Sequence, residues 1–224
     1  MRASPWFVLI TAVFITCLIA ANVVAVKLVA IGAWLVPAGL VIFPLSYLLG
    51  DVLTEVYGFR QARLVIWLGF GCNALFVAAV WLAGLLPAAS GWDGQAAYVR
   101  ILGFTPRLLG ASFAAYLVGE FANAFVLARL KVLTQGRWLW SRTIGSTVVG
   151  QALDSLIFIT LAFAGLLPPA ALLAAVLTQW LLKSGYEIIA TPLTYLVVGF
   201  LKRTEGLDPF DYHLAVRPLP SGDD

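Results

Sequence analysis

Six apolar segments, each long enough to cross a lipid bilayer as a helix, constrain this sequence of 224 residues more than any other feature. A hydrocarbon core about 30 Å thick is crossed by about 20 helical residues. The segments that reach this length are 6–29, 37–57, 62–86, 107–130, 142–166 and 170–201. They predict an all-α integral membrane protein in which six transmembrane helices form one bundle.

The composition also indicates a membrane protein. Hydrophobic residues make up 62% of the chain and charged residues 11%, whereas soluble domains carry about 25% charged residues. The formal net charge of +3 would suit a nucleic-acid partner in a soluble protein. In a membrane protein, basic residues gather in the cytoplasmic loops. We therefore expect the lipid bilayer as a partner and no nucleic acid.

The distribution of Lys and Arg predicts on which side of the membrane the termini lie. With the N-terminus inside, the outer loops hold only Arg100 and Arg107. The inner segments then hold Arg2, Arg60, Arg63, Arg129, Lys131, Arg137, Arg142, Lys202, Arg203 and Arg217. The positive-inside rule therefore places both termini in the cytoplasm. We expect a transmembrane domain over residues 1–204 and a cytoplasmic C-terminal tail over 205–224.

The sequence offers little support for enzyme chemistry or metal binding. Cys17 and Cys72 lie in apolar segments, where a thiol usually behaves as a small buried hydrophobe. With a single histidine, His213, the chain has no ligand set for a metal, and we expect no cofactor. The expected spans contain no histidine and no nucleophile elbow, and we find no nucleotide-binding motif. We therefore do not expect an enzyme.

Polar side chains near the middle of the expected spans are the candidate substrate-binding residues. A charge in the lipid core costs about 2.5 kcal/mol or more, so such side chains usually face the bundle interior. Within several spans they recur three or four residues apart and so share one helix face. We expect these faces to meet at one cavity formed by Asn22, Asn73, Glu120, Asn123, Gln151, Asp154, Lys183 and Glu187.

Purely structural roles remain open for some of these residues. The amide side chains can simply hydrogen-bond to neighbouring helices. Lys183 and Glu187 are four residues apart and could form an ion pair with no ligand role. The charge balance favours a binding role, because Lys183 alone faces three carboxylates, Glu120, Asp154 and Glu187. A bound cation or proton, or a carboxyl group kept neutral by burial, would have to compensate for this excess of negative charge.

A further pair of carboxylates, Asp51 and Glu55, lies at the end of the second span. Their four-residue spacing places both on one face of a helix. Carboxylates near the C-terminal end of a helix oppose its dipole. We therefore expect a cationic partner such as Arg60, Arg63 or a residue of another span. A gate or a structural charge pair is the leading interpretation, and direct substrate contact is the second.

Aromatic side chains lie beside the polar faces, although most of them are expected in the core or against lipid. A planar heterocycle needs an aromatic ring to stack on, a carboxylate for its N–H groups and an amide or lysine for its carbonyl. The expected spans supply all three. The candidate stacking residues are Phe43, Tyr47, Phe158 and Tyr186.

Three separate motifs carry a resemblance to a known family. They are FPLSYLLGDVLTEVYGFRQAR at 43–63, GQALDSLIF at 150–158 and KSGYEIIATPLTY at 183–195. Together they resemble the queuosine-precursor transporter family, also called the vitamin uptake transporter family, over nearly the whole chain. The motif positions of that family fall on Asp51, Gln151, Asp154 and Lys183.

The resemblance implies a bacterial inner-membrane importer with six spans. Its substrates would be planar 7-deazaguanine bases such as 7-cyano-7-deazaguanine, 7-aminomethyl-7-deazaguanine or queuine, salvaged for the tRNA nucleoside queuosine. An alternative is a substrate-binding membrane subunit of an energy-coupling-factor type vitamin importer, which would need an ATPase as its energising partner. The sequence leaves open whether the chain forms a homo-oligomer.

Overall fold

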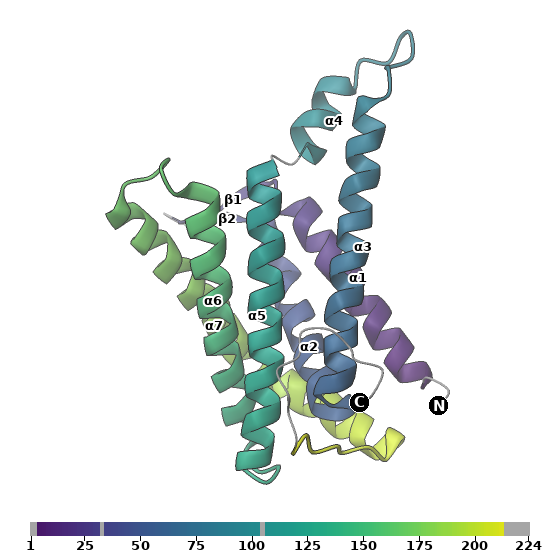
Figure 1. Cartoon of the computed structure of the whole chain (residues 1–224), viewed down its shortest axis with the longest axis vertical. Helices are drawn as coiled ribbons and strands as arrows, with labels where there is room; N and C mark the ends of the chain where they lie inside the picture. The colour runs from purple at the N-terminus through teal and green to yellow at the C-terminus, as the bar shows by residue number, and fades with distance from the viewer. Residues whose placement is uncertain (1–3, 32–33, 104–105, 213–224) are drawn as a thin grey trace.

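The computed structural model describes residues 4–31, 34–103 and 106–212 of the chain. Arg2, His213, Arg217 and the part of the expected tail beyond residue 212 lie outside these ranges. Most of the described residues are helical (Figure 1). In chain order the elements are α1 (Pro5–Val24), β1 (Leu28–Ile31), β2 (Trp34–Pro37), the 3-10 helix η1 (Ala38–Val41), α2 (Phe43–Tyr57), α3 (Phe59–Leu85), α4 (Gln95–Leu102), α5 (Pro106–Leu133), α6 (Leu139–Phe163) and α7 (Pro169–Glu205).

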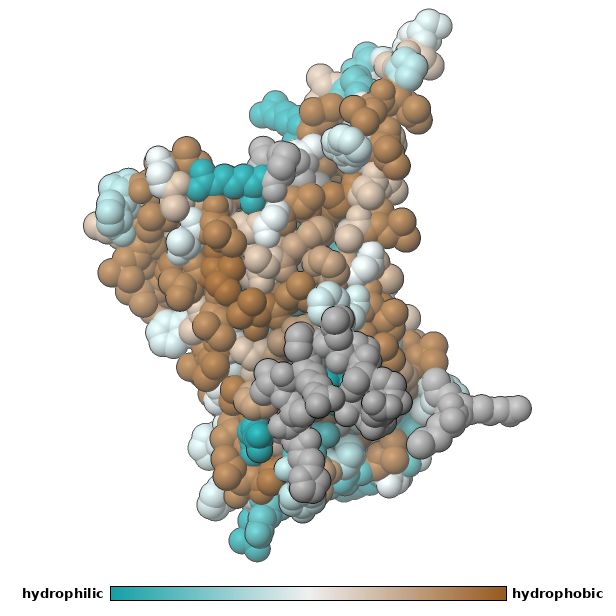
Figure 2. Space-filling model, viewed as in Figure 1, coloured by the Kyte–Doolittle hydropathy of each residue, from teal (hydrophilic) through white to brown (hydrophobic). Residues whose placement is uncertain are grey.

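Five of the described helical segments are long and apolar enough to cross a membrane. They are α1, α3, α5, α6 and α7. Figure 2 shows hydrophobic side chains over the middle of one face of the molecule, with hydrophilic ones toward its two ends. Large apolar side chains such as Ile189 and Leu196 of α7 are exposed, which is favourable only against an apolar surrounding. The chain is a multi-pass membrane protein.

The remaining expected span corresponds to α2, which is shorter than a typical membrane crossing. Its 15 residues extend about 22 Å at 1.5 Å per residue. The hairpin of β1 and β2, followed by η1, lies between α1 and α2. In the described residues, five helices of membrane length and one short helix therefore stand where the sequence predicts six spans.

The connection between α1 and α2 corrects the expectation of an entirely helical chain. Helix α1 ends at Val24 instead of continuing to residue 29. Strand β1 then pairs antiparallel with β2, with Leu28 opposite Pro37 and Ile31 opposite Trp34. Valine and isoleucine fit extended backbone well, and a continuous apolar run does not distinguish a strand from the end of a helix.

Helix α2 is the central element of the bundle. Eleven of its 15 residues are buried, and it contacts α1, α3, α5 and α7. The turn from α2 into α3 is made at Gly58, whose φ of +84° lies in the region that favours glycine. Phe14 of α1 packs with Val52 and Leu53 of α2 in the apolar core. Because α2 is enclosed by its neighbours, its polar side chains also lie in the interior.

The first turn of α1 and the last turn of α7 meet at one end of the bundle, which we call the basal end. The Ser4 hydroxyl donates a hydrogen bond to the carboxylate of Glu205, and the rings of Trp6 and Phe200 pack edge to face with centroids 5.2 Å apart. In Figure 1, the start of α1 (purple) and the end of α7 (yellow) both lie near the bottom of the view.

Candidate binding site

A layer of polar side chains crosses the middle of the bundle. We call it the central layer, and it consists of Asp51, Glu120, Asn123, Gln151, Asp154, Lys183 and Glu187. These residues come from α2, α5, α6 and α7. All are buried except Lys183, which is partly buried. The helices therefore bring together the polar residues that the sequence distributes over more than 130 positions, from Asp51 to Glu187.

Two hydrogen bonds between helices link this layer. The Lys183 ammonium of α7 donates to Asp154 Oδ2 of α6 at 2.5 Å. The Asn123 amide of α5 donates to Asp51 Oδ1 of α2 at 2.8 Å. Glu187 interacts electrostatically with both Asp51 and Glu120. Asp51 therefore belongs to the central layer, whereas Glu55, one turn further along α2, has other partners.

Two glycines bring α5 and α6 close enough to form the layer. A Cβ on Gly119 of α5 would lie 2.9 Å from the Cβ of Asp154, and a Cβ on Gly150 of α6 would lie 2.8 Å from the Cβ of Asn123. Carbon atoms in contact lie about 3.5–4.0 Å apart. Neither glycine can therefore carry a side chain unless the helices shift, and both glycines set the positions of Asp154 and Asn123.

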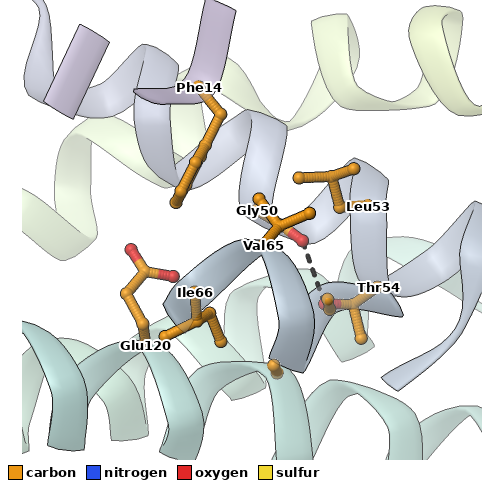
Figure 3. A pocket seen from close by; sticks show the side chains of 9 residues that line it. Phe14, Gly50, Leu53, Thr54, Val65, Ile66 and Glu120 are labelled. Carbon is orange, nitrogen blue, oxygen red and sulfur yellow. Dashed lines mark hydrogen bonds between the residues drawn. The ribbon is translucent and has the colours of Figure 1, made fainter. Parts of the chain in front are cut away.

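Glu120 lies at the edge of a small cavity. Its side chain is 2% exposed, and Figure 3 shows its carboxylate beside the ring of Phe14 of α1 and near Ile66 of α3. The hydroxyl of Thr54, which also lines the cavity, donates to the Gly50 carbonyl at 2.9 Å. The space accommodates about one water molecule. Small-molecule sites usually enclose about 300 Å³ or more, so this cavity cannot hold a heterocycle without movement.

Many buried polar atoms in and beside the central layer have no hydrogen-bond partner among the described residues. Leaving such an atom unpaired costs about 1–3 kcal/mol, and native proteins rarely do so. They include Asp51 Oδ2, Asn123 Oδ1, Thr147 Oγ1, Gln151 Oε1, Ser155 Oγ, Ser184 Oγ and Glu187 Oε1. Water or a polar ligand would supply the missing partners.

Sequence reasoning missed the small hydroxyl residues of this set. Thr147 and Ser155 lie four residues before and after Gln151, so all three share one face of α6. Ser184 lies three residues before Glu187 and is likewise buried on α7. The helical spacing from an already suspected residue is the signal that could have identified them.

The four candidate aromatic residues differ in their placement. The Phe43 ring lies 4.2 Å from the Lys183 ammonium and 4.9 Å from the Tyr47 ring. Phe158 packs edge to face on Phe163 of its own helix, with centroids 6.3 Å apart. Tyr186 is 42% exposed. The structure therefore brings Phe43 and Tyr47 to the central layer and leaves Tyr186 on the surface.

Asn22 and Asn73 form a separate contact between α1 and α3. The Asn22 amide donates to Asn73 Oδ1 at 3.2 Å, and Asn73 is buried. In the described part of the chain, no hydrogen bond joins this pair to the central layer. Hydrogen bonding between helices was the alternative to substrate binding that the sequence offered for the amide side chains. In the structure, Asn22 and Asn73 form such a bond.

At the basal end, Glu55 of α2 is bound by cations from three other helices. Its Oε1 lies 2.7 Å from the Lys202 ammonium, 2.9 Å from the Arg142 guanidinium and 3.5 Å from the Lys131 ammonium. Lys131 also donates to the Glu55 backbone carbonyl at 2.7 Å. We call these four residues the basal cluster. It fastens α5, α6 and α7 to α2.

The segment that follows α7 packs against the basal cluster. Asp208 Oδ1 lies 2.6 Å from the Lys131 ammonium and 2.7 Å from the Lys202 ammonium. Partial burial alone would raise the pKa of Asp208, but hydrogen bonds from these two lysines outweigh it and hold that pKa below its usual value. Asp211 accepts a hydrogen bond from the Phe59 backbone N–H at 3.0 Å. The beginning of the expected tail therefore lies along the basal end.

The central layer offers groups for recognition and none arranged for metal binding. Within the described ranges, no three His, Cys, Asp or Glu side chains lie close enough together to hold a metal ion. Carboxylates accept hydrogen bonds from N–H groups, whereas amide and ammonium groups donate to carbonyl oxygens. This set can therefore both donate hydrogen bonds to a polar organic molecule and accept them from it.

Comparison with known proteins points to transport. A family model described as "Putative vitamin uptake transporter" matches residues 37–197, which include the entire central layer. A Bacillus subtilis (strain 168) protein named "Probable queuosine precursor transporter" is 30% identical over 84% of this chain and 82% of its own length. A "Queuosine precursor transporter" of Escherichia coli (strain K12) is 31% identical over 54% of this chain and 52% of its own. No solved structure matches the chain.

Proposed function

We propose that this chain, which belongs to the vitamin uptake transporter family, carries queuosine precursors across a membrane. The observation that carries the proposal is the similarity, over most of the chain, to relatives named as queuosine precursor transporters. The buried charges within helices of membrane length support it. Ionisable residues inside a membrane protein commonly mark the path of a substrate or an ion.

We further propose that the substrates are planar 7-deazaguanine bases that bind in the central layer. Such a base carries N–H and amino donors on one edge and a carbonyl beside them. The carboxylates of Asp154 and Glu187 are suited to accept from the donor edge, and the Lys183 ammonium is suited to donate to the carbonyl. The rings of Phe43 and Tyr47, which lie next to Lys183, are suited to stack on the base.

Substrate binding requires the bundle to open, because the central layer is closely packed. The ion pair between Lys183 and Asp154 fills the position that we assign to the base. The base would separate these two side chains and replace their mutual contact with its own hydrogen bonds. We propose that the basal cluster around Glu55 is the gate on one side, because α2, α5, α6 and α7 are all joined there.

We also propose that α2, together with the segment before it, makes a sixth crossing of a bacterial inner membrane. The contact of Ser4 with Glu205 supports an even number of crossings, since the start of α1 and the end of α7 then lie on one side of the membrane. The basal end carries Lys131, Arg142 and Lys202, and the positive-inside rule assigns such an end to the cytoplasm.

The queuosine content of tRNA tests this function in a bacterial strain that lacks both precursor synthesis and its own importer. We expect the wild-type chain to restore queuosine when 7-cyano-7-deazaguanine is supplied at a low external concentration. Absence of restoration, with the protein shown to be in the membrane, would contradict the proposal.

Matched amide variants test the site in the same strain. Asp154→Asn and Glu187→Gln each remove a carboxylate that we assign to the base, and both should restore less queuosine at limiting precursor. Asp93→Asn makes the same type of change on the exposed connection between α3 and α4 and should behave as the wild type. Normal restoration by both site variants would overturn the assignment.

A further inference from the structure

We infer that the carboxyl group of Glu120 takes up and releases a proton in each transport cycle, so that a proton gradient drives import of the substrate. This inference rests on the proposed function and names the ion that would energise it. Neither the family description nor the names of the relatives specify an energy source.

The charges in the central layer do not balance. Four carboxylates, those of Asp51, Glu120, Asp154 and Glu187, lie in this layer with one ammonium group. That ammonium, on Lys183, is already bonded to Asp154. The other cations paired with carboxylates among the described residues lie in the basal cluster, against Glu55 and Asp208. Glu120 therefore has no ion pair within the described residues.

A buried carboxylate without a counter-ion is strongly disfavoured. A proton removes its charge completely and occupies almost no space. By contrast, hard metal cations take about six oxygen ligands, and the cavity beside Glu120 is otherwise lined by apolar side chains and by Thr54. The Thr54 hydroxyl already donates to the Gly50 carbonyl. The chemistry of the cavity therefore favours a proton as the bound ion.

The cavity also supplies a place from which a proton can be exchanged. The Glu120 carboxylate borders a space for about one water molecule (Figure 3). A water there could accept or donate a proton directly at the carboxyl oxygens. Gly50 forms part of the same wall, and a Cβ at that position would lie 3.2 Å from Glu120 Oε2. Because Gly50 has no side chain, the Glu120 carboxylate can lie this close to α2.

The charged and titratable groups that face Glu120 come from each polar helix around it. Helix α2 contributes Asp51 and Tyr47, α6 contributes Asp154, and α7 contributes Lys183 and Glu187. Its own helix contributes Tyr116, whose hydroxyl donates to the Ile66 carbonyl at 3.0 Å. Helices α1 and α3 line the cavity with the apolar residues Phe14, Ala62, Val65 and Ile66.

These neighbours provide a direct link between substrate and proton. The base separates the Lys183 ammonium from the Asp154 carboxylate, so the negative charge of Asp154 is no longer compensated by that ammonium. This charge then favours a proton, taken up from water, on Glu120, because two like charges in one buried layer repel each other. By linkage, a proton on Glu120 favours the substrate by the same factor. Substrate and proton would therefore bind together and move in the same direction.

The test uses the purified chain in lipid vesicles with labelled 7-cyano-7-deazaguanine. An inwardly directed proton gradient should drive wild-type accumulation above the external concentration, and a protonophore should abolish the excess. Exchange of internal for external base needs no gradient and should remain. Glu120→Gln should lose the response of accumulation to the proton gradient, whereas the control Asp93→Asn should keep both accumulation and exchange.

The exchange assay separates the failure of this inference from the failure of the proposed function. Absence of wild-type exchange would contradict transport of this base, and the inference with it. Normal exchange without response to a proton gradient, or accumulation driven by a sodium gradient instead, would overturn proton coupling alone. Continued proton-driven accumulation by Glu120→Gln would overturn the assignment to Glu120.

A second measurement on the wild type does not depend on how the variant folds. Addition of 7-cyano-7-deazaguanine to the purified protein in weakly buffered detergent solution should cause net proton uptake, seen as a rise in pH. A pH that does not change on substrate binding, with binding confirmed by the heat released, would contradict cooperative binding of proton and base.

Discussion

Glu55 is the anion around which the basal end is assembled. Its carboxylate is 1% exposed and is shared by Lys131, Arg142 and Lys202, and Asp208 bridges the two lysines from outside. Cations held this closely repel one another, and the carboxylates remove that repulsion. The side chain of one residue thus fixes the relative positions of four helices.

We therefore predict that Glu55→Gln strongly destabilises the fold. Removal of one partner from a buried ion pair usually costs about 3–5 kcal/mol, because the remaining charges stay buried and unpaired. The free energy of unfolding in detergent, from denaturant titration, measures the loss. Asp93→Asn, on the exposed connection after α3, is the control and should change it little. Equal stability of the two variants would mean that the basal cluster does not hold the helices together.

Asp208 gives the stability a predictable dependence on pH. The pKa of Asp208 is lower in the folded protein than its usual value of about 4. Ionised Asp208 therefore adds its full contribution to the free energy of unfolding above a pH of about 4. This contribution is lost as the pH falls through the lowered pKa. The difference in unfolding free energy between the wild type and Asp208→Asn should therefore be constant near neutral pH and shrink in acid. Unfolding titrations of both proteins at several pH values measure it. A difference that grows as the pH falls would contradict the assigned contacts.

The contact between α5 and α6 is the element pairing on which the central layer depends most. Glycines on each helix face the other helix, and each lies against a polar residue of the layer. A methyl group at either position would push the helices apart or rotate them. The geometry of the candidate site is therefore sensitive to residues that carry no functional group themselves.

We predict that Gly119→Ala and Gly150→Ala each impair uptake and reduce stability. Overpacking of a close contact usually costs about 1–3 kcal/mol, and here the displaced side chains are Asp154 and Asn123. Gly110→Ala, also on α5, is the matched control because a Cβ there would meet no atom within 4 Å. Restored tRNA queuosine and unfolding free energy, measured for all three variants, check the prediction. Wild-type uptake and unfolding free energy for both Gly119→Ala and Gly150→Ala would show that α5 and α6 can move apart without loss of stability.

The bounds of the helices were predictable to different degrees. Length and apolar composition located α3, α5, α6 and the start of α7 within three residues of the expected spans. The end of α1 and the start of α2 were not predictable in this way, because the apolar run between them continues through the hairpin and hydropathy alone does not separate strand from helix.

The residues of the central layer could be identified from sequence, whereas their partners could not. A charged side chain in an apolar span usually faces the interior, and the structure buries all residues of the layer except Lys183, which is partly buried. Helical spacing allowed Lys183 to pair with Glu187 as one alternative and placed Asp51 on the same helix face as Glu55. The structure instead pairs Lys183 with Asp154 and Asp51 with Asn123. Partners across helices depend on the rotation of each helix in the bundle, which no local pattern specifies.

The start of α1 and the end of α7 meet at the basal end, although five crossings alone would leave them on opposite sides of the membrane. We therefore predict that fluorescent proteins fused before residue 1 and after residue 224 both fluoresce in the cytoplasm. Alkaline phosphatase inserted at the connection near Asp93 should be active on the outer side. Fluorescence from only one of the two termini would contradict a sixth crossing through α2.

The proposed function depends most directly on binding of the transported base in the central layer. The measurement to make is the initial rate of uptake of labelled 7-cyano-7-deazaguanine, as a function of its concentration, by cells without precursor synthesis or another importer. We predict saturable uptake by the wild type and a KM about tenfold higher or more for Asp154→Asn, since loss of a charged hydrogen-bond partner costs about 1.5–3 kcal/mol. Asp93→Asn should keep the wild-type KM. No saturable uptake by the wild type, or an unchanged KM for Asp154→Asn, would contradict binding of the base in the central layer.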